Sequence, residues 1–393
     1  MAALLATAFC APATAANPLT ATQYKQASAA LRVMSAINLI TLGDATLSSD
    51  VEGKVFVGGN LSAGNAPVAI GGSKSTKYLH GDKYRSLTVG GNATNVQVNN
   101  GIGLSNIQVV VGGAASGVQI NNGNATASLQ VGGSLNAQNF NPTSTKTATY
   151  GVSATNVQAQ DQTFIKQDKT IKAGGTNDLK ATIASVTEAY QTDMATLSQV
   201  LGALTPNATL NTADHNNMKF NFTGTTGDYA VLDIAGSLLS TGGFSLETFA
   251  NANNGKTLVI NVSGNSVNFR ANELGDWSNV QQNIIWNFTD ATTLSINAAI
   301  YGSVLAPKAT VTGDHQLNGS IVAKVFNYSG EVHLGTFNGS TGFLVAPPPN
   351  DGGGHVGTPG VPEPASWMTM LLGFGVIGSL IRSQRRKERL AAA

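Results

Sequence analysis

Glu331 and His333, in the stretch GEVHLG, are the residues whose types and spacing come closest to a catalytic pair. Two residues apart on a strand, their side chains point to the same side, where a carboxylate and an imidazole could exchange a proton. The same spacing suits a turn or a hydrogen bond between neighbouring strands, and we favour that structural role. No H-E-x-x-H or comparable zinc spacing involves the five histidines, His80, His215, His315, His333 and His355. The sequence therefore predicts no catalytic residue and no enzyme activity.

Three acidic residues in GDATLSSDVEG, Asp44, Asp50 and Glu52, are of the type that binds calcium through carboxylate oxygens. Neither an EF-hand loop nor a GGxGxDxUx repeat surrounds them. The chain has one cysteine, Cys10, near its start, so a cysteine-based metal site and a disulfide are not expected. We therefore expect no bound metal and no cofactor.

Four amides recur in two related phrases, VQVNNG at 96–101 and VQINNG at 118–123: Gln97, Asn99, Gln119 and Asn121. Side-chain amides pair well with hydroxyl groups, so stacked copies could present a polar ladder to a polysaccharide. The asparagines could instead only satisfy turns, and that role is the more ordinary one. An ice-binding face usually carries ranked threonines, and we find no TxT ladder at the repeat spacing.

The surrounding repeat predicts the element that would position these amides. VFVGGNL (55–61), LTVGGNA (87–93), VVVGGAA (109–115) and LQVGGSL (129–135) each join a short β-branched strand to a Gly-Gly corner. A unit of about 20 residues buries its apolar face only by stacking on copies of itself, which favours a β-solenoid. Glycine at the corner permits positive φ and lets neighbouring coils pack closely. The alternative is a Gly-rich β-sandwich.

A change of periodicity predicts one long helix at about 177–203. Leu179, Ile183, Tyr190, Met194 and Leu197 fall on one helical face, and Asp178 or Thr176 can cap its start. An earlier helix is expected near residues 22–35. Strands resume after residue 215, several of them solid apolar runs typical of strands buried on both sides.

Composition and the N-terminus indicate export. Lys and Arg total 22, Asp and Glu total 21, and charged residues make up only 11%, so no basic face for nucleic acid is expected. The opening MAALLATAFCAPATAANP has an apolar stretch and an A-x-A site, which predicts a signal peptide at 1–16. The folded domain is placed at 17–345, followed by a Pro/Gly linker at 346–360.

The last segment, 361–389, has the order of a membrane address. Val361, Pro362, Glu363 and Pro364 form an extended motif, and an uncharged apolar run of helical length begins at Trp367. Basic residues including Arg382, Arg385 and Arg386 follow, and they would stay on the cytoplasmic side. These features predict a C-terminal hydrophobic helix that contacts the membrane.

This tail resembles a PEP-CTERM sorting domain. The resemblance implies a Gram-negative bacterium that makes exopolysaccharide, and an exosortase as the partner that recognises the Pro-Glu-Pro motif. The chain would be the substrate of that membrane protease-transpeptidase, and its tail would be removed or exchanged.

The body resembles the choice-of-anchor A family. The stretches LITLGDATLSSDVEGKVFVGGNL (39–61), IIWNFTDATTLSI (284–296) and NGSIVAKVFNYSGEVHLGTFNG (318–339) carry the likeness. Some relatives are adhesins for host matrix proteins. GSVLAPKATVT (302–312) with NGSIVAK is also similar to ice-binding proteins built as a β-solenoid with one helix alongside.

The sequence as a whole predicts a mainly β protein: a parallel β-helix-like solenoid with one long flanking helix. It predicts a secreted, non-enzymatic protein of the cell surface or biofilm matrix that adheres to extracellular polysaccharide or matrix protein. An ice-binding module is the alternative, and a hydrolase of matrix polysaccharide is a minor one.

Overall fold

A computed structural model describes residues 18–69, 85–99, 106–121, 126–136, 146–157, 163–222, 227–245, 255–275 and 277–348. The chain divides into two units, residues 1–346 and 347–393. The helices and strands of the described residues all belong to the first unit. The predicted signal peptide and the predicted C-terminal helix lie outside the described residues.

The first unit is mainly β, as predicted, and its largest sheet has 20 strands within the described part of the chain. One turn of the chain carries three short strands, for example β6, β7 and β8, and successive turns pair in parallel. A turn of this kind therefore contributes to three faces. In stacking order, the first face consists of β16 (Ile165–Gln167), β14 (Lys146–Tyr150), β12 (Thr126–Val131), β9 (Asn106–Val111), β6 (Leu87–Val89), β3 (Val55–Val57), β1 (Leu39–Thr41), the first half of β29 (Ile321–Tyr328), the first half of β27 (Ser303–Gly313), β24 (Ile284–Phe288), β21 (Thr257–Ser263) and β19 (Tyr229–Ala235).

The other two faces follow the same order. The second face consists of β15 (Ala154–Thr155), β13 (Leu135–Asn136), β10 (Ala115–Ser116), β7 (Ala93–Thr94), β4 (Leu61–Ser62), β2 (Ala45–Leu47), the second halves of β29 and β27, β25 (Thr293–Ile296) and β22 (Ser266–Phe269). The third face consists of β11 (Gln119–Asn121), β8 (Gln97–Asn99), β5 (Pro67–Val68), β30 (Val332–His333), β28 (Leu317–Asn318) and β26 (Ile300–Tyr301). Val51 bridges the two halves of this third face by pairing with both Val68 and Val332.

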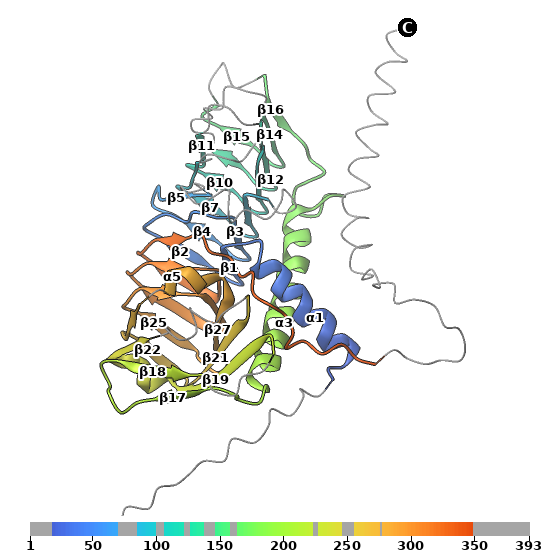
Figure 1. The fold of residues 1–393 in the computed structure, drawn as a ribbon. Helices are drawn as coiled ribbons and strands as arrows, with labels where there is room; N and C mark the ends of the chain where they lie inside the picture. Colours follow the sequence, from blue (N-terminus) through green and yellow to red (C-terminus); the bar gives the residue numbers. More distant parts are fainter. Residues whose placement is uncertain are drawn as a thin grey trace, which may run out of the picture. The chain divides into compact units, whose positions relative to one another are not determined.

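A small four-stranded sheet lies near the end of the stack that β19 forms (Figure 1). It contains an antiparallel pair, while its remaining pairings are parallel. Its strands are β17 (Thr209–Asn211), β18 (Met218–Asn221), β20 (Gly243–Ser245) and β23 (Asn272–Leu274). Short helical segments join the nearby strands: η2 (Gly236–Ser240), α5 (Trp277–Val280) and η3 (Gln281–Asn283).

The order of the turns in the stack differs from their order in the sequence. The first strand, β1, lies in the middle, paired with β3 on one side and with the late strand β29 on the other. From β1 the chain adds turns in one direction as far as β16 and then returns along the stack through α3 (Leu179–Gly202) (Figure 1). From β19 it adds turns back towards β1, and β29 completes the stack. Residues almost 300 positions apart, such as Leu39 and Ile321, are therefore direct neighbours.

Two helices cover the outer side of the first face. Helix α1 (Ala21–Met34) begins with a capping box between Thr20 and Gln23, and Asp178 caps α3. Both helices occupy the segments for which the sequence predicts them. They bury outward residues of the first-face strands, such as Phe56, Val110 and Leu305. This covering explains the solid apolar runs, because the strands beneath α1 and α3 are buried on both sides.

Helix α3 matches the stack in length. Its start lies against the turn of β9, where Gly112 faces the Lys180 Cα, and near its end the Asn261 amide on β21 donates to the Leu201 carbonyl at 3.0 Å. These contacts are seven strand steps apart, or about 34 Å at the usual strand spacing. A helix of 24 residues is about 36 Å long. One helix therefore fastens eight turns together.

The Gly-Gly corners pack closely, as predicted, and the positive φ that glycine permits is not used there. None of Gly58, Gly90, Gly112 and Gly132 is among the residues with positive φ. A Cβ atom at these positions would instead collide with a carbonyl oxygen of the adjacent turn. Positive φ occurs at the next corner, at Asn95, Gly117 and Asn156. Glycine is needed at the first corner for close approach, whereas the second corner needs a residue that tolerates positive φ, either glycine or asparagine.

Candidate functional site

A continuous row of small polar side chains runs along the outer side of the second face. Within each strand the neighbours of these residues point inward, as in β2, where Ala45 and Leu47 are buried and Thr46 is exposed. The ladder pairings place one such residue on each of ten successive turns. We name this row the polar file: Asn268, Ser295, Thr312, Asn327, Thr46, Ser62, Thr94, Ser116, Asn136 and Thr155.

The polar file is uncharged and regular. Its members are exposed or partly exposed, and nine steps at the usual strand spacing make it about 43 Å long. Some neighbours bond to each other: the Ser295 and Thr312 hydroxyls are 3.2 Å apart, and the Asn136 amide donates to the Ser116 hydroxyl at 3.2 Å. These bonds use only part of the hydrogen-bonding capacity of each group. The file can therefore offer a periodic set of donors and acceptors to an extended ligand.

A second column accompanies the file over three turns. Ser266, Thr293 and Thr310 stand in register two residues before Asn268, Ser295 and Thr312. The resulting rows read S-x-N, T-x-S and T-x-T, so polar side chains are ranked over three turns, and the last of these rows is a threonine pair. The rows are separated by 27 and then 17 residues rather than by the 20 to 22 of the glycine repeat. Loops of unequal length hide the ladder from a search at fixed period.

The corner before the second face holds a separate ladder that uses Asp44. Its Oδ1 accepts from the Asn60 backbone N–H at 2.7 Å, Asn60 Oδ1 accepts from Asn92 N at 2.9 Å, and Asn92 Oδ1 accepts from Ala114 N at 2.8 Å. Asp44 therefore fastens the next turn, and Asp50 and Glu52 belong to the third face. Within the described ranges, no three Asp, Glu, His or Cys side chains gather as a metal site would require.

The four predicted amides lie on the third face, on the opposite side of a corner from the polar file. Gln97 pairs in register with Gln119, and Asn99 pairs with Asn121, so the predicted stacking holds for the backbone. The two glutamine side chains are partly exposed, while the side chains of Asn99 and Asn121 lie outside the described part. The amide run covers two turns, whereas the polar file covers ten.

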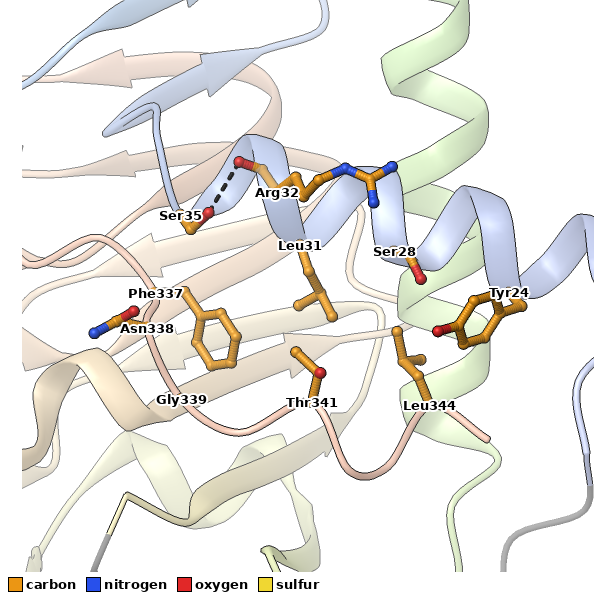
Figure 2. A pocket seen from close by; sticks show the side chains of 10 residues that line it. All are labelled: Tyr24, Ser28, Leu31, Arg32, Ser35, Phe337, Asn338, Gly339, Thr341 and Leu344. Carbon is orange, nitrogen blue, oxygen red and sulfur yellow. Dashed lines mark hydrogen bonds between the residues drawn. The ribbon is translucent and has the colours of Figure 1, made fainter. Parts of the chain in front are cut away.

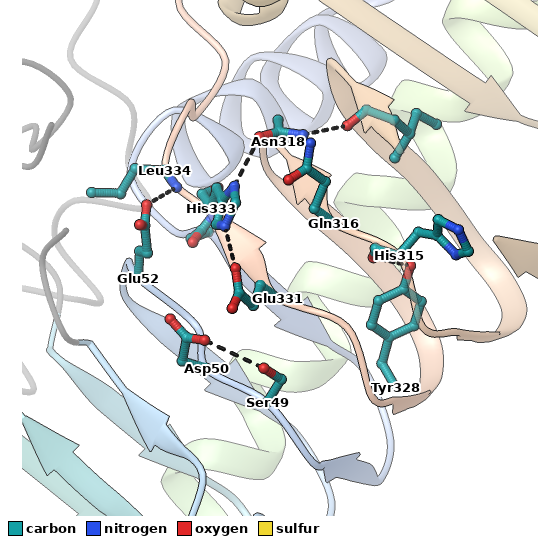
Figure 3. Close-up of polar contacts among 12 residues, drawn as sticks. Ser49, Asp50, Glu52, His315, Gln316, Asn318, Tyr328, Glu331, His333 and Leu334 are labelled. Carbon is teal, nitrogen blue, oxygen red and sulfur yellow. Dashed lines mark hydrogen bonds and ion pairs between the residues drawn. The ribbon is translucent and has the colours of Figure 1, made fainter. Parts of the chain in front are cut away.

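The acid–base pair considered from the sequence also lies on the third face, within a bonded chain (Figure 3). His333 Nε2 is 2.7 Å from Glu331 Oε2, and its Nδ1 is 3.0 Å from Asn318 Oδ1. The Asn318 amide in turn donates to the Ile300 carbonyl of the next turn at 3.2 Å. Both ring nitrogens therefore have a partner, and the imidazole connects neighbouring turns. This geometry favours the structural role.

Three ionisable side chains also form hydrogen bonds between turns of the stack. Glu52 Oε2 accepts from Leu334 N at 2.7 Å, and Glu273 Oε2 accepts from Tyr301 N at 2.7 Å. Burial raises the pKa of Glu273 well above its usual range, and the Tyr301 N–H opposes this. Burial and nearby Asp314 raise the pKa of Tyr328, whose hydroxyl donates to the His315 carbonyl. Each group thus bonds to the backbone of another turn.

An open cavity of about 360 Å³ lies between α1 and the segment 337–344 (Figure 2). Leu31, Phe337 and Leu344 supply its apolar part, while the Arg32 guanidinium points away from Phe337 in Figure 2. Burial raises the pKa of Asp193, on neighbouring α3, to about 6, and Arg32 partly offsets this. The lining holds no convergent set of catalytic groups; it is Tyr24, Ser28, Leu31, Arg32, Ser35, Phe337, Asn338, Gly339, Thr341 and Leu344.

The sorting motif Val361–Pro364 and the flanks Trp367, Arg382, Arg385 and Arg386 lie outside the described residues. Among the residues that are described, which end at 348, no helix is long and apolar enough to cross a membrane.

Comparisons with known proteins identify both parts of the chain. No curated protein matches it. A crystal structure of an ice-binding protein from an Antarctic bacterium, Flavobacteriaceae, aligns at 13% identity and a TM-score of 0.24, covering 79% of this chain and 98% of that one. A family model described as "Putative Ice-binding-like adhesive domain" matches residues 30–334, and the PEP-CTERM protein-sorting motif matches residues 360–387. The sorting motif implies processing by an exosortase at the membrane. The chain therefore belongs to the ice-binding-like adhesive domain family, and it is an exported, adhesin-like protein of the cell surface.

Proposed function

We propose that this protein is a non-enzymatic adhesin of the choice-of-anchor A type, a β-solenoid that binds a neutral, hydroxyl-rich extracellular polysaccharide through the polar file. The observation that carries the proposal is the register of that file over ten successive turns. Hydroxyl and amide groups both donate and accept hydrogen bonds, as do the hydroxyls of a sugar polymer.

Repetition is the source of affinity in this proposal. A single exposed hydrogen bond contributes little, because it replaces a bond to water. A polymer that touches several turns at once makes its later contacts intramolecularly, so the weak contacts combine. The regular spacing and the neutral charge of the file suit a long neutral ligand better than a small charged one.

The double substitution Ser62→Tyr and Thr94→Tyr tests the file. Both positions are exposed and adjacent in register, and tyrosine is well tolerated on strands, so the fold should be kept. We expect affinity for the producing strain's neutral exopolysaccharide, or for cellulose as a defined probe, to fall about tenfold or more, since two bulky rings interrupt the row. Sedimentation with the insoluble polymer measures the bound fraction.

The matched control is Gln97→Tyr with Gln119→Tyr, two residues in register on the third face. This variant should bind as the parent does. If only the control loses binding, the ligand belongs to the predicted amides instead of the polar file. Release of reducing ends from the polymer would support the hydrolase alternative, and binding confined to matrix protein would also oppose the proposal.

Ice binding is the second candidate, favoured by the three rows of paired hydroxyl and amide side chains at Ser266–Asn268, Thr293–Ser295 and Thr310–Thr312. Thermal hysteresis and ice recrystallisation are measured on the same proteins. An activity on ice, without polysaccharide binding by the parent protein, would replace the polymer by ice as the ligand.

We further propose that the tail is a transient anchor. After removal of the signal peptide at 1–16, the apolar run from Trp367 would hold the protein in the inner membrane of a Gram-negative cell until an exosortase cuts near Pro362–Pro364. We expect the protein from the outer envelope or matrix to lack the residues after this motif, as measured by mass spectrometry. Cells without the exosortase should retain the full-length form. An intact tail in the inner membrane of normal cells would contradict transient anchoring.

A further inference from the structure

One end of the stack carries a concentration of lysines that the near-neutral composition conceals. The end consists of β14, β15, β16, the following loop and the first turn of α3 (Figure 1). In its described residues, 146–157 and 163–180, only two acidic residues, Asp168 and Asp178, oppose the basic ones. We name the basic residues the lysine end: Lys146, Lys166, Lys169, Lys172 and Lys180.

Both carboxylates at this end are bonded to the loop itself. Asp168 Oδ1 accepts from the Thr170 backbone N–H at 2.9 Å and from its hydroxyl at 2.6 Å. Asp178 accepts from Ala181 N at 3.0 Å and Gly174 N at 2.7 Å, and these bonds lower its pKa below the ordinary value. Lys166, Lys169, Lys172 and Lys180 are exposed. The carboxylates therefore order the loop, and a net positive charge remains for a partner.

The backbone that carries the lysines is held in place by buried and hydrogen-bonded residues. Ile171 is 4% exposed and anchors the loop in the cluster beneath the helices, and Asn177 N bonds back to Thr170 O at 2.8 Å. Lys172 lies over Gly151, and Lys180 lies over Gly112, with about 2.9 Å from each Lys Cα to the place a glycine Cβ would take. These two turns are two strand steps apart, or about 10 Å. The positive charges are thus arrayed along the stack.

Protection of an edge strand explains only part of this pattern. β16 ends the first face, and a lysine on an edge strand discourages pairing with another chain. Lys166 fits that role. Lys169, Lys172 and Lys180 lie beyond the strand, in the loop and the helix, where no edge needs protection.

The lysine end is also far from the point at which the chain leaves the body. Ser340 hydrogen-bonds with Thr257 on β21, and Val345 O accepts from Leu19 N at 3.2 Å. β21 and β16 are ten strand steps apart along the first face, or roughly 48 Å. A body tethered through its C-terminal side therefore presents the lysines at a distance from the tether.

We propose that the lysine end is a second binding surface, for a polyanionic polysaccharide that carries carboxylate or sulfate groups. Lysine ammonium groups act as point charges with a flexible reach, which suits anionic groups spaced along a sugar chain. Single-stranded nucleic acid binding usually adds exposed aromatic rings for base stacking. Here the Lys146 ammonium lies over the Phe164 ring, 4.6 Å from the ring centroid, so a lysine occupies the ring face on which a base would stack. The described surface therefore favours the polysaccharide.

The test compares two triple variants of the full chain, held in mild detergent, on immobilised alginate. Lys169→Gln, Lys172→Gln and Lys180→Gln should lower affinity about tenfold or more and weaken its dependence on salt between about 50 and 500 mM. The control, Lys25→Gln, Lys219→Gln and Lys324→Gln, makes the same charge change at exposed sites elsewhere and should keep parental affinity. Binding to cellulose, which tests the polar file, should be unchanged in both.

Equal losses in the two triple variants would show a nonspecific charge effect and overturn the proposal. Tighter lysine-dependent binding to single-stranded DNA than to alginate would replace the polysaccharide by nucleic acid. Self-association of the lysine variant without any change in alginate affinity would leave edge protection as the role of these residues.

Discussion

Gly112→Ala is expected to destabilise the protein by about 3 kcal/mol or more, the upper range for an inserted methyl group in a packed site. The added Cβ would collide with the Gly90 carbonyl oxygen of the adjacent turn and would lie 2.9 Å from the Lys180 Cα of α3. Both obstacles are backbone atoms, so no side-chain rotation relieves them. The sheet and α3 would have to separate, which would expose the apolar surface between them.

Urea unfolding followed by circular dichroism measures this loss, and the control is Ala114→Ser. Ala114 follows the same Gly-Gly corner, and the next turn already has serine there, at Ser134. The control should change the unfolding free energy by less than about 0.5 kcal/mol. A stability of Gly112→Ala equal to that of the control would mean that the corner glycines are not required for close packing.

The sequence was sufficient to predict that copies of VGG stack, since a strand of that length cannot bury an apolar face alone. It also located α3, because Ile183, Tyr190 and Met194 repeat at helical spacing and face the sheet. It did not decide which of two properties of glycine the corners use. Positive φ and close approach both favour glycine, and only the position of the neighbouring turn, with α3 above it, decides between them.

The polar file could not be predicted, for two physical reasons. Ser62 and Thr94 are neighbours although they are 32 positions apart in the sequence, whereas other neighbours in the file are 20 or 22 apart, so no constant period connects the file. Thr46 and Asn327 are also neighbours, because β2, near the start of the sequence, pairs with β29, near the end of the domain. Parallel pairing depends on which strands meet, and local residue patterns carry no information about that order.

Hydrogen-bonded stacking of amides was predicted, but the structure displays it most clearly at a place the sequence did not indicate. Asp233, Asn261 and Asn287 stand in register on the first face, beneath the C-terminal part of α3. The Asn261 amide donates to Asp233 Oδ1 at 3.0 Å, and the Asn287 amide donates to Asn261 Oδ1 at 2.8 Å. In sequence, these residues interrupt apolar strands and have no repeated phrase around them.

Asn287→Ala is the second substitution with a large expected effect. The Asn287 side chain is fully buried; its amide also donates to the Ser198 carbonyl at 3.0 Å, and its oxygen accepts from the Ser198 hydroxyl at 2.7 Å. Alanine removes these bonds and leaves Asn261 Oδ1 and the Ser198 hydroxyl without that partner in a buried interface. Because each stranded buried group costs roughly 1–3 kcal/mol, we expect a loss of about 3 kcal/mol in unfolding free energy.

A double-mutant cycle with Ser198→Ala separates the lost bonds from the cavity. If the Ser198–Asn287 contact holds α3 to the sheet, the two losses should fail to add by on the order of 1 kcal/mol, because the second substitution removes a group that the first has already left unpaired. Hydrogen exchange should show faster opening of the C-terminal half of α3 in either single variant, while β12 and β14, at the other end of the stack, keep their protection. Additive losses, or uniform exchange along α3, would mean that the helix is held by apolar contacts alone and that the amide stack only orders the strands beneath it.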